Sequence, residues 1–277
     1  MNISVLILTL NEEENLPYCL SKLEWCDDVV VLDSLSTDRT KEIAEAGGAR
    51  FFERAFDDFA SQRNYGLHEI DYKHDWVLML DADEETTPEL VEEMRTVAAN
   101  APEGLALFRM RRKDYLFGQW MRRCNAYPLW FGRLVRPEKV TVTRAVNEEY
   151  HTDGEIGQLE GHLLHYSYNG GFDAWFAEQN LHSSMEAERL LSNEDHGRWK
   201  LADLFDKDPT VKRRALKHIA FALPGRPIIY FLYYYILKGG FLDGRAALTH
   251  SILRAFYEYM VDVKVKEGRR RQAGLPV

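Results

Sequence analysis

The stretch DWVLMLDADEETTP, residues 75–88, decides the fold that this sequence predicts. In it, an apolar run leads directly into Asp81, Asp83 and two glutamates. A short continuous apolar run is typical of a strand buried on both faces, as in a parallel sheet covered by helices. Thr87 and Pro88 form an N-cap and first-turn pair, so a helix should begin at once. The carboxylates are therefore expected at the carboxyl edge of a sheet, where open α/β folds bind ligands.

Neighbouring negative charges at a strand end repel one another unless a cation joins them. Hard divalent cations take oxygen ligands, and Mg²⁺ typically uses one or two carboxylates together with substrate phosphates. The competing interpretation is a solvated loop at a helix N-terminus, where the helix dipole favours acidic residues. A divalent-metal site at Asp81 and Asp83 is therefore the hypothesis that the rest of the chain has to support.

Strands and helices alternate through the first hundred residues. Further buried-strand candidates lie at residues 3–8, 29–32 and 49–53. Helical patterns lie after Pro17 and at residues 39–46, 59–69 and 88–100. This βαβαβαβα series predicts an α/β fold with a mostly parallel sheet and helices on both faces.

The regular alternation fades after Pro102, and the last third of the chain is helical in pattern. Strands are expected at residues 105–111, 129–136 and 158–168. Helices are expected at residues 175–191, 216–222, 228–237 and 246–265. We place a domain boundary near Gly170, between a nucleotide-type domain at 1–170 and a helical C-terminal region at 171–277.

The charge distribution bounds the class of partner. A formal net charge of −9 argues against a general nucleic-acid binder, whose footprint would be basic. Lys and Arg nevertheless cluster after Lys212 and again at 264–271, which indicates an anionic surface as partner of the C-terminal part. The apolar run at 228–237 is too short to span a bilayer, but its tyrosines and basic flanks suit a helix lying in the interface. An ordinary buried helix is the alternative there.

The N-terminus begins directly with a strand and lacks a basic region, so we expect no signal peptide. The three cysteines show no ligand-pair spacing, which is typical of reduced thiols in a cytosolic compartment. We therefore predict a cytoplasmic protein that is peripheral on the inner face of the cytoplasmic membrane.

Three predicted strand ends carry polar residues that would converge at one sheet edge. They are Thr9 to Glu12, Asp33 to Asp38, and the D-x-D motif Asp81-Ala82-Asp83. No G-x-G-x-x-G follows the first strand and no P-loop motif is present, which disfavours dinucleotide and P-loop sites. Asp33 could accept from a ribose hydroxyl or a base N–H, and a metal at the D-x-D motif could neutralise a diphosphate. The combination predicts a site for a nucleoside diphosphate compound.

The segments ISVLILTLNEEENL, VVVLDSLSTDRT and WVLMLDADEETTPEL together resemble the inverting, metal-dependent glycosyltransferases of family 2, which have the GT-A fold. FASQRNYG (59–66), GHLLHYSY (161–168) and GGFLDGRAAL (239–248) are similar to lipopolysaccharide-core glucosyltransferases and their cell-envelope relatives. The resemblance covers most of the chain and is most specific in its first hundred residues. It implies transfer of a sugar, glucose in that subgroup, from a UDP-sugar to a lipopolysaccharide-core or other cell-envelope glycolipid.

Nucleotide-sugar-binding roles follow from the resemblance. Thr9, Asn11 and Glu12 would line the nucleotide pocket. Asp33 would contact the uracil or ribose, and Ser36 would shape that loop. Asp33 could instead be a simple helix cap.

Metal and phosphate roles follow in the same way. Asp81 would bind the ribose or a metal-bound water, and Asp83 would ligate Mg²⁺ or Mn²⁺ directly. His165 would complete the metal shell or meet the diphosphate, and Arg63 would hold the sugar or phosphate. His165 could equally be a buried core histidine, and Arg63 an exposed helix residue.

An inverting transfer also needs a base on the acceptor side. Glu148 is the candidate, because AVNEEYH resembles the family's acceptor-side His-Glu element. Asn147 replaces the usual histidine, so Glu149 and Asp153 stay open as alternatives. Glu148 could also be an ordinary surface residue.

Other functions are less consistent with the motif order. DADEETT superficially matches the nucleophile loop of haloacid-dehalogenase phosphatases, but that loop should follow the first strand rather than the fourth. A nucleotidyltransferase would need a Gly-rich loop after the first strand. A different polysaccharide or lipid-linked acceptor, or a membrane-associated nucleotide-sugar-binding module without turnover, are the remaining alternatives.

Overall fold

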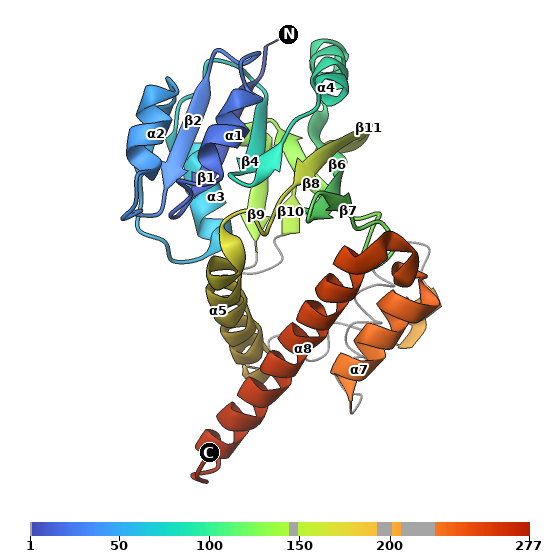
Figure 1. The fold of residues 1–277 in the computed structure, drawn as a ribbon. Coiled ribbons are helices and arrows are strands. Elements are labelled where there is room, and N and C mark those ends of the chain that lie inside the picture. The colour runs from blue at the N-terminus through green and yellow to red at the C-terminus, as the bar shows by residue number, and fades with distance from the viewer. Residues whose placement is uncertain (1, 144–148, 193–200, 206–224) are drawn as a thin grey trace. The chain divides into compact units, whose positions relative to one another are not determined.

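The computed structural model describes residues 2–143, 149–192, 201–205 and 225–277 (Figure 1). The chain forms two compact units. One comprises Met1–Arg122 and Ala126–Phe172, and the other comprises Arg123–Asn125 and Asp173–Val277. The predicted helix at 216–222 lies outside the described residues.

The first unit begins with the predicted alternation of strands and helices. Its strands are β1 (Ser4–Thr9), β2 (Val29–Asp33), β3 (Arg50–Glu53) and β4 (Val77–Asp81). Its helices are α1 (Leu16–Ser21), α2 (Thr40–Ala46), α3 (Phe59–Glu69) and α4 (Pro88–Asn100). The series is confirmed, and α3 and α4 have the predicted bounds.

The remaining strands of this unit include three that the sequence predicts and four that it does not. The predicted ones are β6 (Leu105–Leu116), β8 (Trp130–Val135) and β11 (Glu155–His165). The short additional strands are β5 (Glu84–Glu85), β7 (Gln119–Trp120), β9 (Thr141–Thr143) and β10 (Glu149–His151).

Within the described residues, the main sheet has the strand order β3-β2-β1-β4-β8-β6-β11-β5, with β7 paired to β6. Strands β3, β2, β1 and β4 are parallel, β8 is antiparallel to both its neighbours, and β11 is parallel to β6. Strands β6 and β11 therefore run in the same direction as β4. The carboxyl ends of all six lie at one edge, and the predicted α/β, GT-A-like class with a mostly parallel sheet is confirmed.

Helices cover both faces of the sheet because alternate side chains of the central strands point to opposite sides. Ile7 of β1 belongs to one buried cluster with Leu16 of α1 and Leu90 of α4. Leu6 belongs to the cluster on the other face, which includes Leu67 of α3. At Gly66 the helix approaches the sheet so closely that a Cβ would lie 2.5 Å from Cδ2 of Leu6.

The second unit contains the C-terminal helices. They are α5 (Gly171–Leu191, whose first two residues belong to the first unit), η2 (Leu201–Phe205), α7 (Arg226–Phe231), the π-helix η3 (Leu232–Leu237), η4 (Gly240–Asp243) and α8 (Gly244–Gln272). The predicted helix at 228–237 is thus part α-helix and part π-helix.

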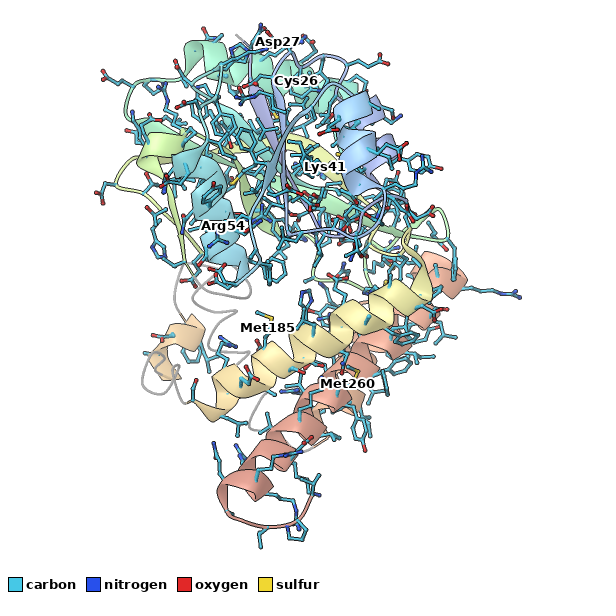
Figure 2. The ribbon with its side chains drawn as sticks, turned by 90° about the vertical axis from the view of Figure 1, so that its left-hand side faces the viewer. Cys26, Asp27, Lys41, Arg54, Met185 and Met260 are labelled. Carbon is cyan, nitrogen blue, oxygen red and sulfur yellow. The ribbon has the colours of Figure 1, made fainter. Side chains whose placement is uncertain are left out.

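Polar contacts join these helices. Figure 2 labels Met185 on α5 and Met260 on α8. Nζ of Lys264 on α8 donates to Oδ1 of Asn180 at 2.8 Å and to Oγ of Ser183 at 2.7 Å, both on α5. Arg226 of α7 is buried and pairs with Glu258 and Asp262 of α8. Among the described residues, no helix combines the length and apolarity needed to cross a membrane.

Candidate active site

The loops that follow β1 and β2 are joined through the carboxylate of Asp33. Oγ1 of Thr9 donates to its Oδ1 at 2.7 Å, and the backbone N and Oγ of Ser36 donate to its two oxygens, each at 2.6 Å. Asp33 is 1% exposed. Three of the predicted nucleotide-site residues therefore form one buried cluster that fixes the shape of both loops.

Asn11 and Glu12 continue this link between the loops. The backbone N of Asn11 donates to Oγ of Ser36 at 2.7 Å, and its side-chain Oδ1 accepts from the backbone N of Thr37 at 2.8 Å. Asn11 has φ 56°, in the left-handed region that asparagine tolerates. The backbone N of Glu12 donates to Oγ1 of Thr40 at 2.8 Å.

Two leucines that the sequence reasoning missed lie in the same loops. Leu10 is 47% exposed and Leu35 is 53% exposed, and Leu35 has φ 66°. Apolar residues inside otherwise polar strand-end loops were the signal available for them. They offer apolar surface against which a flat base can lie.

Asp81, at the end of β4, is held by two arginines. Its Oδ1 accepts from Nη2 of Arg63 at 2.7 Å, and its Oδ2 accepts from Nη2 of Arg133 at 2.6 Å. Arg63 is 3% exposed, which excludes the alternative interpretation of an exposed helix residue. Burial alone would raise the pKa of Asp81, but the guanidinium groups of Arg133 and Arg63 hold that pKa well below its ordinary value.

Glu84 is fully buried and is also neutralised by arginines. Its Oε1 accepts from Nη2 of Arg133 at 2.8 Å and from Nη1 of Arg112 at 3.2 Å. The sequence predicted that a metal would offset the repulsion among the carboxylates after β4. For Asp81 and Glu84, guanidinium groups offset it instead. Only Asp83 and the half-buried Glu85 stand outside this arginine network.

Asp83 contacts His165, the last residue of β11. Its Oδ2 lies 3.0 Å from Nε2 of His165, and Nδ1 of that ring lies 2.6 Å from Oδ1 of Asp114. Burial alone would lower the pKa of His165, and Arg112 acts in the same direction. The carboxylates of Asp83 and Asp114 outweigh both and raise that pKa to about 10. The structure therefore brings the two predicted metal ligands together.

The donor set at this pair fits a divalent metal. A metal with bonds of about 2.1 Å in octahedral geometry holds neighbouring ligands about 3.0 Å apart. The separation between Oδ2 of Asp83 and Nε2 of His165 matches this value, and Asp114 orients the ring from its other nitrogen. In the part of the chain that the structure describes, no group of three or more His, Cys, Asp or Glu side chains could hold a metal. Two protein ligands leave room for diphosphate oxygens, as Mg²⁺ sites commonly do.

The predicted base, Glu148, lies outside the described residues. Of the alternatives, Glu149 begins β10 and Asp153 is exposed in the turn before β11. Besides Leu10 and Leu35, sequence reasoning missed three charged residues at the site, Arg133, Arg112 and Asp114. The feature that could have indicated them is the presence of charged residues within the strands WFGRLV and LALFRMRRKDYL.

The carboxyl edge of the sheet thus gathers two cross-linked polar loops, an acid–arginine network and an acid–histidine pair. The family model described as Glycosyl transferase family 2 matches residues 4–155, more than half of the chain. The chain belongs to glycosyl transferase family 2. This confirms the family that the sequence motifs resemble, and with it that the protein is a glycosyltransferase.

Two relatives of this glycosyltransferase match it over nearly its whole length. The lipopolysaccharide core biosynthesis glycosyltransferase LpsC of Rhizobium meliloti is 26% identical over 95% of this chain and 91% of its own. An uncharacterized glycosyltransferase of Rickettsia typhi is 25% identical over 96% of this chain and 87% of its own. Glucosyl-3-phosphoglycerate synthase from Mycobacterium tuberculosis, solved with Mn²⁺, UDP and glucosyl-3-phosphoglycerate, is 25% identical with a TM-score of 0.35. That match covers 40% of this chain and 44% of the other.

Proposed function

We propose that this glycosyltransferase is metal-dependent and inverting, and that it transfers a sugar, glucose as the first candidate, from a UDP-sugar to a lipopolysaccharide-core or other cell-envelope glycolipid. The observation that carries the proposal is the 3.0 Å distance between Oδ2 of Asp83 and Nε2 of His165. These two residues lie at the sheet edge where strands β1 and β2 end and their loops begin. The lipopolysaccharide-core relative supports the class of acceptor.

The nucleotide would lie against the loops after β1 and β2. Asp33 accepts hydrogen bonds from Thr9 and Ser36 at three points, and an ionised carboxylate offers about four acceptor sites. Because Asp33 is 1% exposed, its role would be to fix the loops that hold the uracil or ribose, while Leu10 and Leu35 supply apolar contact to the uracil. The hydrogen bonds of Asn11 and Glu12 hold the two loops together.

The ribose would be bound by Asp81. Its two arginine contacts leave acceptor capacity, and its side chain is one third exposed. Arg63 and Arg133 keep the carboxylate ionised and fix its direction. The role of Arg63 is then to position Asp81, in place of the direct contact with sugar or phosphate that the motif implied.

Asp83 and His165 would hold a divalent cation, Mg²⁺ or Mn²⁺, which stabilises negative charge on the departing diphosphate when bound. Nε2 of His165 lies within hydrogen-bond distance of Asp83, and the raised pKa of His165 favours a proton between them. That proton has to leave before Nε2 can act as a ligand. Asp114 keeps the other ring nitrogen engaged, so the ring does not turn away.

The base that deprotonates the acceptor hydroxyl would come from the segment that leads into β11. Glu148 is the first candidate, with Glu149 and Asp153 as alternatives. Replacing each separately by its amide separates them, because only the base variant should lose transfer while keeping UDP binding.

We also infer that the second unit contacts an anionic membrane surface on the cytoplasmic side. Along α8, exposed apolar residues recur every three or four positions and so form one face, namely Leu248, Ile252, Phe256, Tyr259 and Val263. Exposed Arg245 and Lys266 flank this face at its two ends. We call these seven residues the α8 stripe.

The charges of this unit favour that assignment. Glu258 and Asp262, the acids of the central part of α8, pair with the buried Arg226. These two ion pairs offset the acidic charges that lie nearest the α8 stripe. On α7 and η3 the exposed residues are likewise apolar: Ile228, Ile229, Leu232, Tyr233, Ile236 and Leu237. Such a face suits insertion into an anionic interface.

The proposed activity is tested by thermal shift of the full chain with a panel of UDP-sugars. A ligand that binds only the folded form raises its unfolding temperature. UDP-glucose with Mn²⁺ should raise this temperature, and EDTA or Asp83→Asn should remove most of the rise. An equal rise without metal, or no rise with any UDP-sugar, would contradict the proposal.

A further inference from the structure

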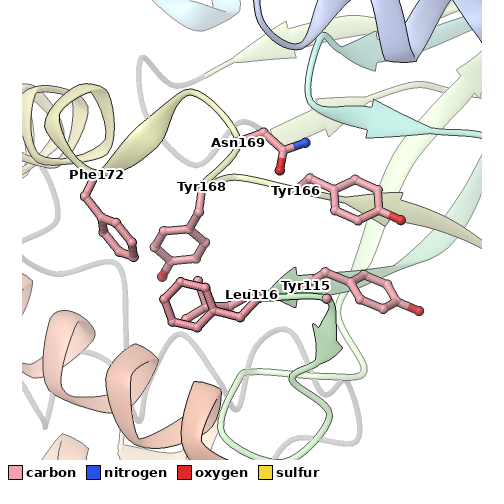
Figure 3. Close-up of a pocket in the computed structure, with 8 residues that line it drawn as sticks. Tyr115, Leu116, Tyr166, Tyr168, Asn169 and Phe172 are labelled. Carbon is pink, nitrogen blue, oxygen red and sulfur yellow. The ribbon is translucent and has the colours of Figure 1, made fainter.

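An aromatic pocket opens at the carboxyl ends of β6 and β11, within the first unit (Figure 3). Its volume is about 180 Å³. The turn between β6 and β7 and the residues that follow β11 form its walls, which include Tyr115, Phe117, Tyr166, Tyr168, Asn169 and Phe172. None of the proposed nucleotide or metal contacts uses these side chains.

The pocket adjoins the proposed metal pair. Tyr115 directly follows Asp114 and Tyr166 directly follows His165, and the two tyrosine rings stack with centroids 5.3 Å apart. Since β6 and β11 run in the same direction as β4, the pocket lies at the edge that carries Asp83. Strands β4 and β8 separate it from β1 and β2, whose loops would hold the nucleotide. A group bound here would therefore lie on the side of the metal pair that faces away from the proposed uracil site.

Phe117 is held in an unfavourable backbone conformation at the mouth of this pocket. Leu116 pairs with Gln119, so Phe117 and Gly118 form a two-residue hairpin turn, and both have positive φ, 51° and 71°. Such turns favour Asn-Gly, and a bulky residue with positive φ is an outlier. Phe117 is nevertheless 70% exposed. Neither the turn nor burial accounts for a phenylalanine there, whereas contact with a ligand would.

The aromatic rings around the turn form a continuous surface. The ring of Phe117 lies 5.9 Å from that of Phe172, which lies 5.5 Å from that of Tyr168. None of the lining residues, all of them described, is charged; their polar groups are tyrosine hydroxyls and the Asn169 amide. This chemistry matches a neutral ring with an apolar face and a hydroxyl rim, and not a phosphate.

We propose that this pocket binds a pyranose ring of the acceptor glycan. Its volume is below the roughly 300–1,000 Å³ of sites for drug-sized ligands, so it would take one sugar ring rather than an extended chain. The proposal rests on the proposed glycosyl transfer. The pocket would be the subsite, next to the metal pair, that positions the acceptor hydroxyl.

The variant Phe117→Asn tests the pocket without endangering the fold, because it creates the preferred Asn-Gly turn. Saturation-transfer-difference NMR on the full chain with Mg²⁺ and UDP would use methyl α-D-glucopyranoside and methyl α-D-mannopyranoside as probes. We expect saturation of the pyranoside ring protons in the wild-type protein and about tenfold weaker binding in Phe117→Asn, which corresponds to about 1.4 kcal/mol. The unfolding temperature should not fall. Tyr18→Asn, which removes a similarly exposed aromatic residue from α1, should leave binding unchanged.

Equal pyranoside binding in wild type and Phe117→Asn, or none in the wild type while UDP binds, would overturn the pocket assignment and leave the proposed function standing. Weaker binding of UDP-glucose relative to UDP in Phe117→Asn would assign the ring to the donor and overturn the acceptor assignment. Absence of UDP signals in both proteins would contradict the proposed function. The pyranoside comparison would still test the pocket in that case.

Discussion

Oδ2 of Asp83 lies 3.0 Å from Nε2 of His165, although the two residues are 82 positions apart in the chain. Two residues earlier, both oxygens of Asp81 are occupied by buried arginines. The two aspartates of one D-x-D motif therefore have different environments. Asp83 faces a potential ligand partner, and Asp81 is fixed within an ion-pair network.

This difference predicts different outcomes for the same substitution. Asp83→Asn should retain the unfolding temperature and lower metal-dependent transfer by at least about 100-fold, because one of two protein ligands loses its charge. Transfer from UDP-glucose with Mn²⁺, measured as UDP release, provides the readout. Asp75→Asn is the matched control, because Asp75 is exposed and lies just before β4. Its transfer activity should equal that of the wild type. Full activity of Asp83→Asn would remove Asp83 from the metal site.

Arg133 should be among the most important side chains for stability. Arg133→Met removes the cation that Asp81 shares with the fully buried Glu84. Breaking a buried pair costs about 3–5 kcal/mol, and we expect the low end of that range because Arg63 and Arg112 still pair with the two acids. Urea unfolding would measure the loss. Arg39→Met, which breaks an exposed pair with Glu42, should change little. Adding Glu84→Gln to Arg133→Met should recover part of the loss; no recovery would mean that the guanidinium group does not act through Glu84.

Much of the fold follows from local signals in the sequence. Helices α3 and α4 have the predicted bounds because their starts are set by side-chain caps. Oδ1 of Asp58 accepts from the backbone N of Ser61, and Oγ1 of Thr87 accepts from that of Leu90. The strand ends that carry Thr9, Asp33 and Asp83 were likewise predictable, since apolar runs end where polar residues begin.

The charge balance of the site was not predictable in this way. Arg133 reaches Asp81 only because antiparallel β8 inserts between β4 and β6, and no local pattern specifies that strand order. Because the sequence does not reveal that Arg133 lies beside Asp81, the acids after β4 indicated a metal site at Asp81 as well as at Asp83. The aromatic pocket depends on the same long-range pairing, because Tyr115 and Tyr166 meet only when β6 lies beside β11.

His162 should make the protein less stable in mild acid. Burial lowers its pKa, and the charges of Lys113 and Arg111 lower it further, while its ring lies 3.0 Å from the hydroxyl of Tyr127. The unfolded chain therefore binds a proton at higher pH than the folded chain does, so stability falls as the pH drops below about 6.5. Urea unfolding at pH 7.5 and pH 5 should show a smaller decrease for His162→Gln than for the wild type. Equal decreases would exclude this residue as the cause.

Membrane association should depend on the α8 stripe. Ile252→Glu with Phe256→Glu should weaken co-sedimentation with phosphatidylethanolamine–phosphatidylglycerol vesicles by at least about tenfold, because each buried apolar side chain contributes about 1.5–3 kcal/mol. Binding should also weaken with salt. Tyr18→Glu in the first unit is the control. Binding that is as strong to neutral phosphatidylcholine vesicles, or unaffected by the double substitution, would contradict the proposed surface.

The central claim is that Asp83 and His165 hold a cation that meets the diphosphate of a nucleotide bound across the β1 and β2 loops. The most direct test is a crystal structure with UDP and Mn²⁺, with the metal located by anomalous scattering. The account predicts an anomalous peak within bonding distance of Oδ2 of Asp83 and Nε2 of His165, and a uracil against Leu10 and Leu35. A nucleotide bound away from these loops, or a metal that contacts neither side chain, would contradict it.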